Sequence, residues 1–227
     1  MEKATAWLKK ALAYEFTNED LLRRALTHRS APGRNNERLE FLGDSVLQLV
    51  VSEHVYREKD DAREGRLSRL RSSLVKDATL SEVATELGIG EHLILGSGEK
   101  KTGGHRRASI LADAIEAIFG AVYLDAGFDA ARKVVERAFG DRLVHLPGAG
   151  ELRDPKSRLQ EFLQARQMAL PTYDLVNVSG KAHKQFFQVS CAIEDGNQVT
   201  TGSGTTRRDA EQEAAAKMLE RLDDAND

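Results

Sequence analysis

Three carboxylates lie within eight positions at the start of an apolar helical pattern: Glu37, Glu40 and Asp44. In a helix that turns about 100° per residue, they share an arc of about 60°. The apolar side chains of this stretch fall on the opposite side: Leu39, Leu42 and Val46. A single acid near a helix start is usually a solvated group that complements the helix dipole. Three on one stripe repel one another unless a cation neutralises them, so the stripe suggests a metal site.

A second acidic stripe lies in residues 110–123, where Asp113 and Glu116 are about 60° apart on a helix. The rest of this helix is so apolar that we expect it to be buried on nearly all sides. Buried carboxylates need partners, and this segment contains no Lys or Arg. The two stripes together strengthen the interpretation as a metal site.

The composition is that of an ordinary globular protein, with 41% apolar and 30% charged residues, and 227 residues leave room for two modest domains. No run approaches the roughly 18 apolar residues of a membrane span. The first residues lack the basic-then-apolar layout of a signal peptide. We therefore expect a cytoplasmic protein with no membrane partner. The single cysteine, Cys191, excludes an internal disulfide and a multi-cysteine zinc site, and its apolar neighbours predict a buried strand position.

The net charge of −3 argues mildly against a nucleic-acid partner. The basic residues are unevenly distributed, however, and each group alone is more often a solvated face than a binding site. They gather in four segments: 63–76, 100–107, 181–184 and 207–208.

Helical periodicity predicts an all-α domain over residues 1–146. The glycines and lysines of 96–104 predict a mobile loop within it. The expected helices cover 3–13, a segment capped by Asn18, 36 to about 56, 65–74, 80–87 and a segment that begins near 109.

The periodicity changes after residues 147–153, which the Pro and Gly residues predict to be a linker. The order helix, three strands, helix predicts a separate small α+β (α-β-β-β-α) domain over 154–227. Its expected elements are helix 156–168, strands 173–178, 186–193 and 198–202, and helix 209–222.

These residues together resemble a bacterial ribonuclease III over essentially the whole chain. The most specific part is Asn36 to Ser45, NERLEFLGDS. The C-terminal part resembles a double-stranded RNA-binding domain, although Lys181 stands where that family usually has Pro and Arg207-Arg208 where it usually has Lys-Lys. Further family-like segments are 26–30, 64–65, 101–104, 109–113 and Glu116.

The resemblance implies a symmetric homodimer that cleaves double-stranded RNA with Mg²⁺, for which Mn²⁺ can substitute. It implies 5′-phosphate and 3′-hydroxyl ends with short 3′ overhangs, and processing of ribosomal and other RNA precursors. It also implies that Phe41, which helical counting places beside the carboxylates and away from the core, inserts into a cavity on the partner subunit.

The residues agree with a Mg²⁺ site, because four carboxylates can converge when the two helices pack and supply hard oxygen ligands. Such a site can activate water and stabilise the phosphate in its transition state. The expected ligands are Glu40, Asp44, Asp113 and Glu116. The resemblance implies that the two active sites of the dimer line one valley. It adds Glu37 and Glu64 as further acidic positions of that valley, which either bind a second ion or contact RNA.

In the second domain, recognition of A-form RNA would run through shape, 2′-hydroxyl and phosphate contacts. The start of the last helix would lie over phosphates with Arg207 and Arg208. The expected minor-groove contacts are Gln160, Gln164 and His183.

Three alternatives remain at this point. Six histidines could support general acid–base cleavage through a cyclic phosphate, although none is placed convincingly near another, and His28 is better explained as a structural residue near the site. The chain could bind duplex RNA without cutting it. It could also be a helical scaffold in which a metal serves only stability.

Overall fold

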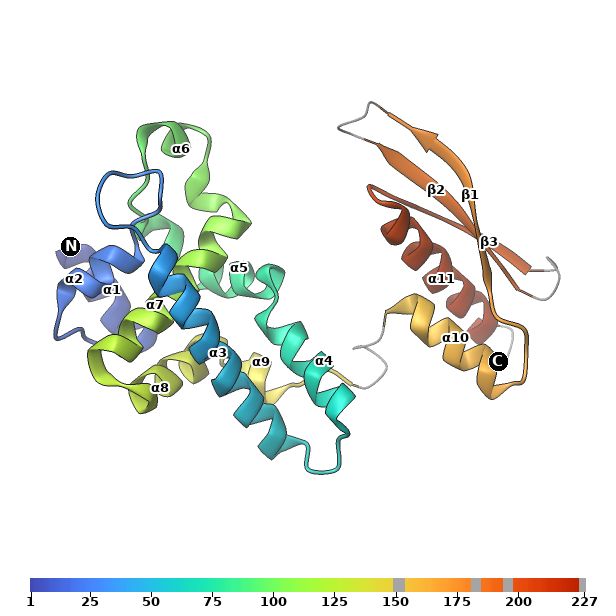
Figure 1. Cartoon of the computed structure of the whole chain (residues 1–227), viewed down its shortest axis with the longest axis horizontal. Helices are drawn as coiled ribbons and strands as arrows, with labels where there is room; N and C mark the ends of the chain where they lie inside the picture. The colour runs from blue at the N-terminus through green and yellow to red at the C-terminus, as the bar shows by residue number, and fades with distance from the viewer. Residues whose placement is uncertain (149–153, 181–184, 194–197, 225–227) are drawn as a thin grey trace. The chain divides into compact units, whose positions relative to one another are not determined.

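The chain folds into two compact units in this computed structural model, Met1–Pro147 and Gly148–Asp227 (Figure 1). The structure describes residues 1–148, 154–180, 185–193 and 198–224. The described part of the first unit is helical apart from one isolated bridge, and the second has the order helix, three strands, helix. The predicted fold class is confirmed. Most of the predicted linker, 147–153, lies outside the described residues.

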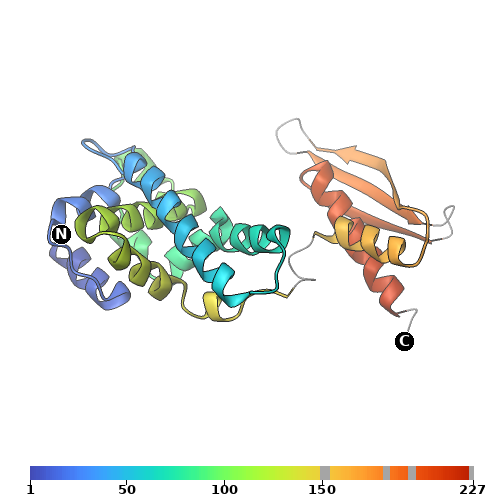
Figure 2. The ribbon, with the colours of Figure 1, turned by 60° about the horizontal axis from the view of Figure 1, so that its bottom comes forward.

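The first unit contains two long central helices, α3 and α7, against which shorter helices pack (Figures 1 and 2). Local signals explain several of its boundaries. Asn18, for example, caps α2 by accepting a hydrogen bond from the Asp20 amide at 3.1 Å. The α-helices are α1 (Glu2–Leu12), α2 (Glu19–Ala25), α3 (Glu37–Glu58), α4 (Glu64–Val75), α5 (Asp77–Glu86), α6 (Ser97–Lys101), α7 (Ala108–Ala126), α8 (Phe128–Phe139) and α9 (Asp141–Val144). Short 3₁₀ helices are η1 (Ile89–His92) and η2 (Gly104–Arg106).

Helix α7 is the centre of this unit's core, as its nearly continuous apolar sequence predicts. Its side chains are buried from Ile110 to Val122, apart from the half-buried Asp113 and Glu116. The apolar face of α3 packs along it with Leu39, Val46 and further buried residues. The two acidic stripes are therefore carried by the two most tightly associated helices of the molecule.

The expectation of a mobile loop over 96–104 was wrong. This segment holds helix α6 and the first residue of η2. The carboxylate of Glu99 forms an ion pair with Arg107 at 2.7 Å, and Gly103 makes the turn between the two helices with a φ of 79°. The glycine at this point marks a turn between two helical segments and not a mobile loop. The ion pair that stabilises the turn joins residues that are eight positions apart in the sequence.

The second unit contains a three-stranded antiparallel sheet of order β1-β2-β3 and two helices that pack together (Figure 2). Residue Tyr173 pairs with Cys191 between β1 and β2, and Cys191 pairs with Thr200 between β2 and β3. A bulge interrupts β1 between Leu175 and Asn177. The elements are α10 (Pro155–Ala165), β1 (Thr172–Ser179), β2 (Phe186–Ile193), β3 (Gln198–Gly204) and α11 (Arg207–Asp224).

This unit has its own core between the sheet and the helices. Cys191 is fully buried there, as predicted. Gly202 lets β3 approach α11 closely, because a Cβ at this position would lie 2.2 Å from the Ala210 carbonyl oxygen. The core residues are Leu159, Leu163, Cys191, Ile193, Ala214, Ala215, Met218, Leu219 and Leu222. Among the described residues of the whole chain, no helix has the length and apolar character needed to cross a membrane.

Candidate active site

Two glycines bring the acidic stripes of α3 and α7 together. A Cβ on Gly43 would lie 1.7 Å from the carbonyl oxygen of Glu116, and a Cβ on Gly120 would lie 2.2 Å from that of Leu39. The helix backbones therefore touch at the point where Gly43 is followed by Asp44 and faces Glu116. No larger side chain fits at either position without separating the helices.

Glu116 lies at the centre of the resulting acidic cluster. Burial, followed by the charges of nearby carboxylates, raises its pKa to about 8. Those neighbours are, in order of effect, Asp44, Glu40, Asp113 and Asp77. Its surroundings therefore oppose ionisation of the Glu116 carboxyl at neutral pH.

Two more members of the cluster show the same direction of change. Burial raises the pKa of Glu40, and the charge of Asp113 raises it further. Burial also raises the pKa of Asp113, whereas His28 and Arg29 oppose that change. The structure thus brings Glu40, Asp113 and Glu116 into one electrostatic group, as the two stripes predicted.

Asp44 belongs to this group but is also held by a neighbour on its own helix. Both of its carboxylate oxygens accept a hydrogen bond from Nε2 of Gln48, at 2.9 and 3.1 Å. No group of three or more Asp, Glu, His or Cys side chains in the described residues is arranged to hold a metal ion as it stands. The carboxylates are close enough to repel one another, and Gln48 holds Asp44 in its present orientation.

Glu37 and Glu64 occupy different surroundings from the four central acids. Glu37 is exposed at the edge of the cluster, where it raises the pKa of Glu40 and lies 3.9 Å from Arg29. Glu64 begins α4, and its Oε1 accepts a hydrogen bond from Ser68 at 2.7 Å. Glu64 is not among the carboxylates that raise the pKa of Glu116.

Asp77 is an acidic neighbour that the sequence did not indicate. It is exposed at the first position of α5, yet its charge raises the pKa of both Asp113 and Glu116. Asp77 is separated from both stripes in sequence and is brought near them by the packing of α5 against α7. No spacing in the sequence could have revealed that proximity.

Phe41 lies outside the core, as helical counting predicted, with 78% of its surface exposed. It stands at the rim of a cavity of about 540 Å³. Leu42 lines this cavity and is only half-buried, so its expected place in the core was wrong; Gly43 makes the close contact with α7 instead. The cavity is lined by Arg24, Glu37, Arg38, Leu39, Phe41, Leu42 and Leu124.

The expected RNA contacts of the second unit are exposed where they are described. Gln160 and Gln164 lie one turn apart on α10 and are exposed, beside the buried Leu159 and Leu163. Arg207 and Arg208 begin α11 and are both exposed. The guanidinium of Arg207 is paired with Glu211 at 2.9 Å. His183 and Lys181 lie outside the described residues.

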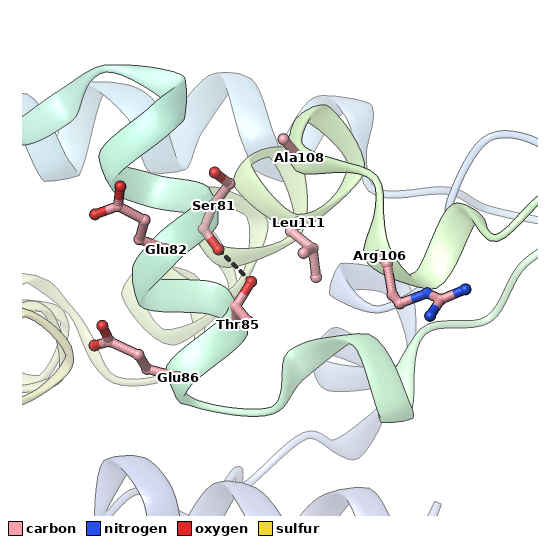
Figure 3. A pocket seen from close by; sticks show the side chains of 7 residues that line it. All are labelled: Ser81, Glu82, Thr85, Glu86, Arg106, Ala108 and Leu111. Atoms are coloured by element: carbon pink, nitrogen blue, oxygen red, sulfur yellow. Dashed lines mark hydrogen bonds between the residues drawn. The ribbon is translucent and has the colours of Figure 1, made fainter.

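A separate pocket of about 330 Å³ lies between α5 and the start of α7 (Figure 3). Its hydroxyl groups donate to nearby carbonyl oxygens, Ser81 to Ala78 and Thr85 to Ser81. Its two glutamates, Glu82 and Glu86, are paired with Arg142. The hydroxyl groups and glutamates of this pocket are thus already engaged, and none of the expected site residues lines it.

Comparison with known families matches both units of the chain. Residues 18–143 match the family described as Ribonuclease-III-like, and residues 155–222 match the double-stranded RNA binding motif. The first match contains both acidic stripes, and the second spans the α-β-β-β-α unit.

Curated relatives extend over nearly the full length. Ribonuclease 3 of Alkalilimnicola ehrlichii is 51% identical over 220 residues, which cover 97% of this chain and 96% of the relative. Ribonuclease 3 of Nitrosococcus oceani is 54% identical over 214 residues, which cover 93% of this chain and 92% of the relative.

Two solved structures of the ribonuclease III nuclease domain from Campylobacter jejuni are also similar. One is 40% identical with a TM-score of 0.61, and covers 64% of this chain and 99% of that one. The other concerns flexibility in the region involved in dimer formation of that protein. It is 44% identical with a TM-score of 0.57, and the match covers 58% of this chain and 93% of that one. Together with the acidic centre between α3 and α7, these matches show that the chain belongs to the ribonuclease III family, the endonucleases of double-stranded RNA.

Proposed function

We propose that this chain cleaves double-stranded RNA in a Mg²⁺-dependent reaction, with Mn²⁺ as a substitute, and that Glu40, Asp44, Asp113 and Glu116 are the metal ligands. The observation that carries the proposal is the buried Glu116 carboxyl, whose ionisation is opposed by burial and by three acidic neighbours within this set. A divalent cation removes that opposition, because it binds the ionised form and neutralises the cluster.

The chemistry of the donor set fits Mg²⁺. All four groups are carboxylates, the hard oxygen ligands that Mg²⁺ prefers alongside retained waters. Mg²⁺, when bound, lowers the pKa of a coordinated water and offsets charge on the phosphate. The chain contributes the close helix contact at Gly43, which brings Glu116 near Glu40 and Asp44.

The proposed products have 5′-phosphate and 3′-hydroxyl ends with short 3′ overhangs. Attack of water on the phosphorus leaves these ends, since the ribose 2′-hydroxyl takes no part as a nucleophile. The competing acid–base mechanism finds little support, because several histidines are held by other groups. Such contacts join His28 to Ser30, His54 to the Leu143 carbonyl and His92 to the Trp7 ring.

We further propose a two-fold homodimer with Phe41 at its contact. Phe41 is exposed, and the adjoining cavity has Leu39, Leu42 and Leu124 in its lining. In an isologous dimer, each Phe41 can enter the cavity of the other subunit, because both belong to the same surface patch. Two sites related by a two-fold axis also suit the antiparallel strands of duplex RNA. Glu37 and Glu64 would then line the valley, as second-ion ligands or RNA contacts.

The Phe41→Ala variant should weaken this dimer, because truncating a buried aromatic anchor costs about 2 kcal/mol or more of binding free energy. Sedimentation velocity over a range of protein concentrations measures the effect. Leu49→Ala is the matched control, since Leu49 is also exposed on α3. A dimer that persists unchanged at low concentration would refute the role of Phe41.

RNA binding by the second unit is proposed to involve Gln160, Gln164 and His183 at minor grooves and Arg207 and Arg208 at the intervening phosphates. Cytoplasmic location and processing of ribosomal and other RNA precursors complete the proposal. These last two assignments rest on membership of the family.

The decisive test is the Glu116→Gln variant on a duplex of about 30 base pairs, longer than the ~16 base pairs that one such binding domain spans. We expect cleavage to fall by at least about 1,000-fold in Mg²⁺, since a demanding metal ligand is lost. Binding measured in Ca²⁺ should persist. Glu136→Gln, the same change at an exposed position of α8, is the control. Undiminished cleavage by Glu116→Gln would refute the site, whereas a wild-type chain that binds the duplex but does not cut it in Mg²⁺ would favour a protein that only binds RNA.

A further inference from the structure

Arginines line two adjoining cavities at the loop that joins α2 to α3. The cavities measure about 340 and 370 Å³, and both have Arg24, Gly33 and Arg34 in their linings. Arg23 lines the first cavity, and Arg38 lines the second. These four arginines, which we call the arginine site, therefore surround one concave part of the nuclease unit, although the whole chain has a net charge of −3.

The backbone of the loop holds the arginine site together. The Ala31 amide donates to the His28 carbonyl at 2.9 Å. Further along, the Asn36 amide donates to the Thr27 carbonyl at 2.8 Å. Gly33 turns the chain between these contacts with a φ of 102°, in the left-handed region that favours glycine. The loop therefore returns to the end of α2, which carries two of the four arginines.

The guanidinium groups of the arginine site have few partners in the protein. Within the described residues, those of Arg23, Arg34 and Arg38 take part in no ion pair or hydrogen bond. The guanidinium of Arg24 donates from Nε to the Asn35 carbonyl at 3.3 Å. The donors of the site are therefore largely available to a ligand.

The acids of this region leave the positive charge unbalanced. Asp20 is the one carboxylate among the described residues that line the two cavities. Glu37, next to Arg38 in the sequence, accepts a hydrogen bond from Asn35 at 2.8 Å and lies 3.9 Å from Arg29. Like charges held close together are unfavourable unless an ion of opposite charge neutralises them. The arginine site is thus suited to an anion.

Helix dipoles explain only half of the arrangement. Arg23 and Arg24 lie in the last turn of α2, where a cation complements the negative end of the dipole. Arg38 lies in the first turn of α3, at the positive end, where a cation is disfavoured. Arg34 belongs to the loop. A solvated basic surface accounts for two of the four arginines, whereas a bound anion accounts for all of them.

The chemistry of the site favours phosphoryl groups. A phosphoryl group presents three strong acceptor oxygens, and guanidinium groups bind such oxygens in a bidentate manner. A planar carboxylate has two oxygens and is matched by one guanidinium fork. Two adjoining cavities leave room for more than one phosphoryl group. In the described part of the chain, no aromatic side chain lines either cavity, so a nucleobase would find no ring to stack on.

We propose that Arg23, Arg24, Arg34 and Arg38 bind an anion with two or more phosphoryl groups and recognise it without a base. Two sources share this chemistry: successive phosphates of an RNA strand and a free oligophosphate. The inference goes beyond the proposed function, because it requires neither the metal ligands nor cleavage. It also concerns a different cavity from the one at Phe41, since Arg23 and Arg34 line only the arginine site.

Isothermal titration of the full chain with inorganic tripolyphosphate, in metal-free buffer, tests the site. Arg23→Gln and Arg34→Gln should each weaken binding about tenfold or more, because a charge-assisted hydrogen bond is lost. Both side chains are exposed, so the variants should fold. Lys133→Gln, which removes an exposed positive charge from α8, is the control. Absence of binding by wild type, or equal affinity in all four proteins, would overturn the proposal.

The backbone amide of Gly33 gives a readout that needs no substitution. Gly33 lies in the wall that the two cavities share. Its ¹H and ¹⁵N resonances in the wild-type chain should therefore shift as tripolyphosphate is added, and citrate, a tricarboxylate, should shift them less at the same concentration. Unmoved Gly33 resonances, or a response to citrate as large as that to tripolyphosphate, would overturn the assignment to phosphoryl groups.

Binding of duplex RNA in Ca²⁺ identifies the source of the anion. If RNA phosphates occupy the site, Arg34→Gln should reduce the slope of log affinity against log salt concentration by about one. If a free oligophosphate is the occupant, Arg34→Gln should bind the duplex as wild type does and still lose tripolyphosphate. Each result retains the site and names its source. Failure of the proposed function appears differently, as a wild-type chain that does not cleave the duplex in Mg²⁺.

Discussion

The carboxylates of the acidic centre in the first unit behave in the opposite way to the paired carboxylates of the second unit. Between α3 and α7, Glu40, Asp113 and Glu116 have raised pKa values, because burial and like charges oppose their ionisation. In the second unit, the pKa values of Glu211 and Glu213 are lowered, although burial works against the change at both. Acids that stabilise the fold are recognisable by the basic or hydrogen-bond-donating groups that pair with them. Acids suited to catalysis are recognisable because they lack such partners.

The partners in the second unit are explicit. Glu211 accepts hydrogen bonds from Lys156 at 2.6 Å and from Arg207 at 2.9 Å. Glu213 forms an ion pair with Lys217 at 2.9 Å and accepts from the Ser203 amide. The corresponding acids of the first unit have Gln48 near Asp44 and Arg29 near Glu37. The proposal that the acidic centre binds a cation from solution rests on that imbalance.

The two patterns have opposite consequences for stability against pH. A raised folded pKa means that the folded state of the metal-free chain retains a proton that the unfolded chain releases. The stability that this retained proton contributes is therefore lost as the pH rises from 4.5, the ordinary pKa of a glutamate, to about 8, the raised pKa of Glu116. A lowered pKa, as at Glu211, gives stability that is present above the unfolded value and is lost as pH falls through the folded one.

Among the changes that test the contrast between the two units, separating the helices that create the acidic centre should have the largest effect. In Gly43→Ala, the new methyl group would overlap the Glu116 carbonyl, so α3 and α7 must move apart. We expect cleavage to fall by at least about 100-fold, as displacements near 1 Å commonly cause. Single-turnover cleavage measures the change, and Gly98→Ala, in open space on α6, is the control. Equal activity of the two variants would show that the close contact is dispensable.

A smaller effect is expected from removing a paired acid. Glu211→Gln should destabilise the second unit by about 1–2 kcal/mol, because Lys156 and Arg207 lose their common partner. Calorimetric unfolding of the full chain at neutral pH tests this. The difference should disappear at acidic pH, and Glu220→Gln, an exposed acid on the same helix, should change little. A Glu211→Gln chain that is more stable than wild type would show that the paired acid does not stabilise the second unit, and would contradict the contrast drawn with the acidic centre.

The smallest expected effect distinguishes two neighbouring arginines. Arg207 shares its charge with Glu211, whereas Arg208 interacts more weakly with Asp154. Arg208→Ala should therefore weaken duplex binding more than Arg207→Ala. It should also reduce the salt slope, the steepness with which the logarithm of the binding constant falls with the logarithm of salt concentration, by about one. Fluorescence anisotropy in Ca²⁺ at several salt concentrations measures both. Salt slopes unaffected by either change would contradict the phosphate contacts.

The sequence was most informative where periodicity decides the outcome. The two stripes, the exposure of Phe41 and the change to an α+β unit all follow from spacing along one element. Leu42, Asp77 and α6 could not be predicted in the same way. Each depends on contacts between distant segments, such as the backbone contact at Gly43 or the ion pair between Glu99 and Arg107.

We propose that Glu116 lies in a cluster that destabilises the metal-free fold and binds a cation. Thermal unfolding of wild type and Glu116→Gln at pH 9, with and without Mg²⁺, measures both properties in one experiment. Without metal, the variant should be more stable by roughly 1–3 kcal/mol after allowance for solvent screening, and this gain should vanish near pH 6. Mg²⁺ should stabilise only the wild type. A variant that is less stable than wild type at pH 9, or equally stabilised by Mg²⁺, would contradict the account.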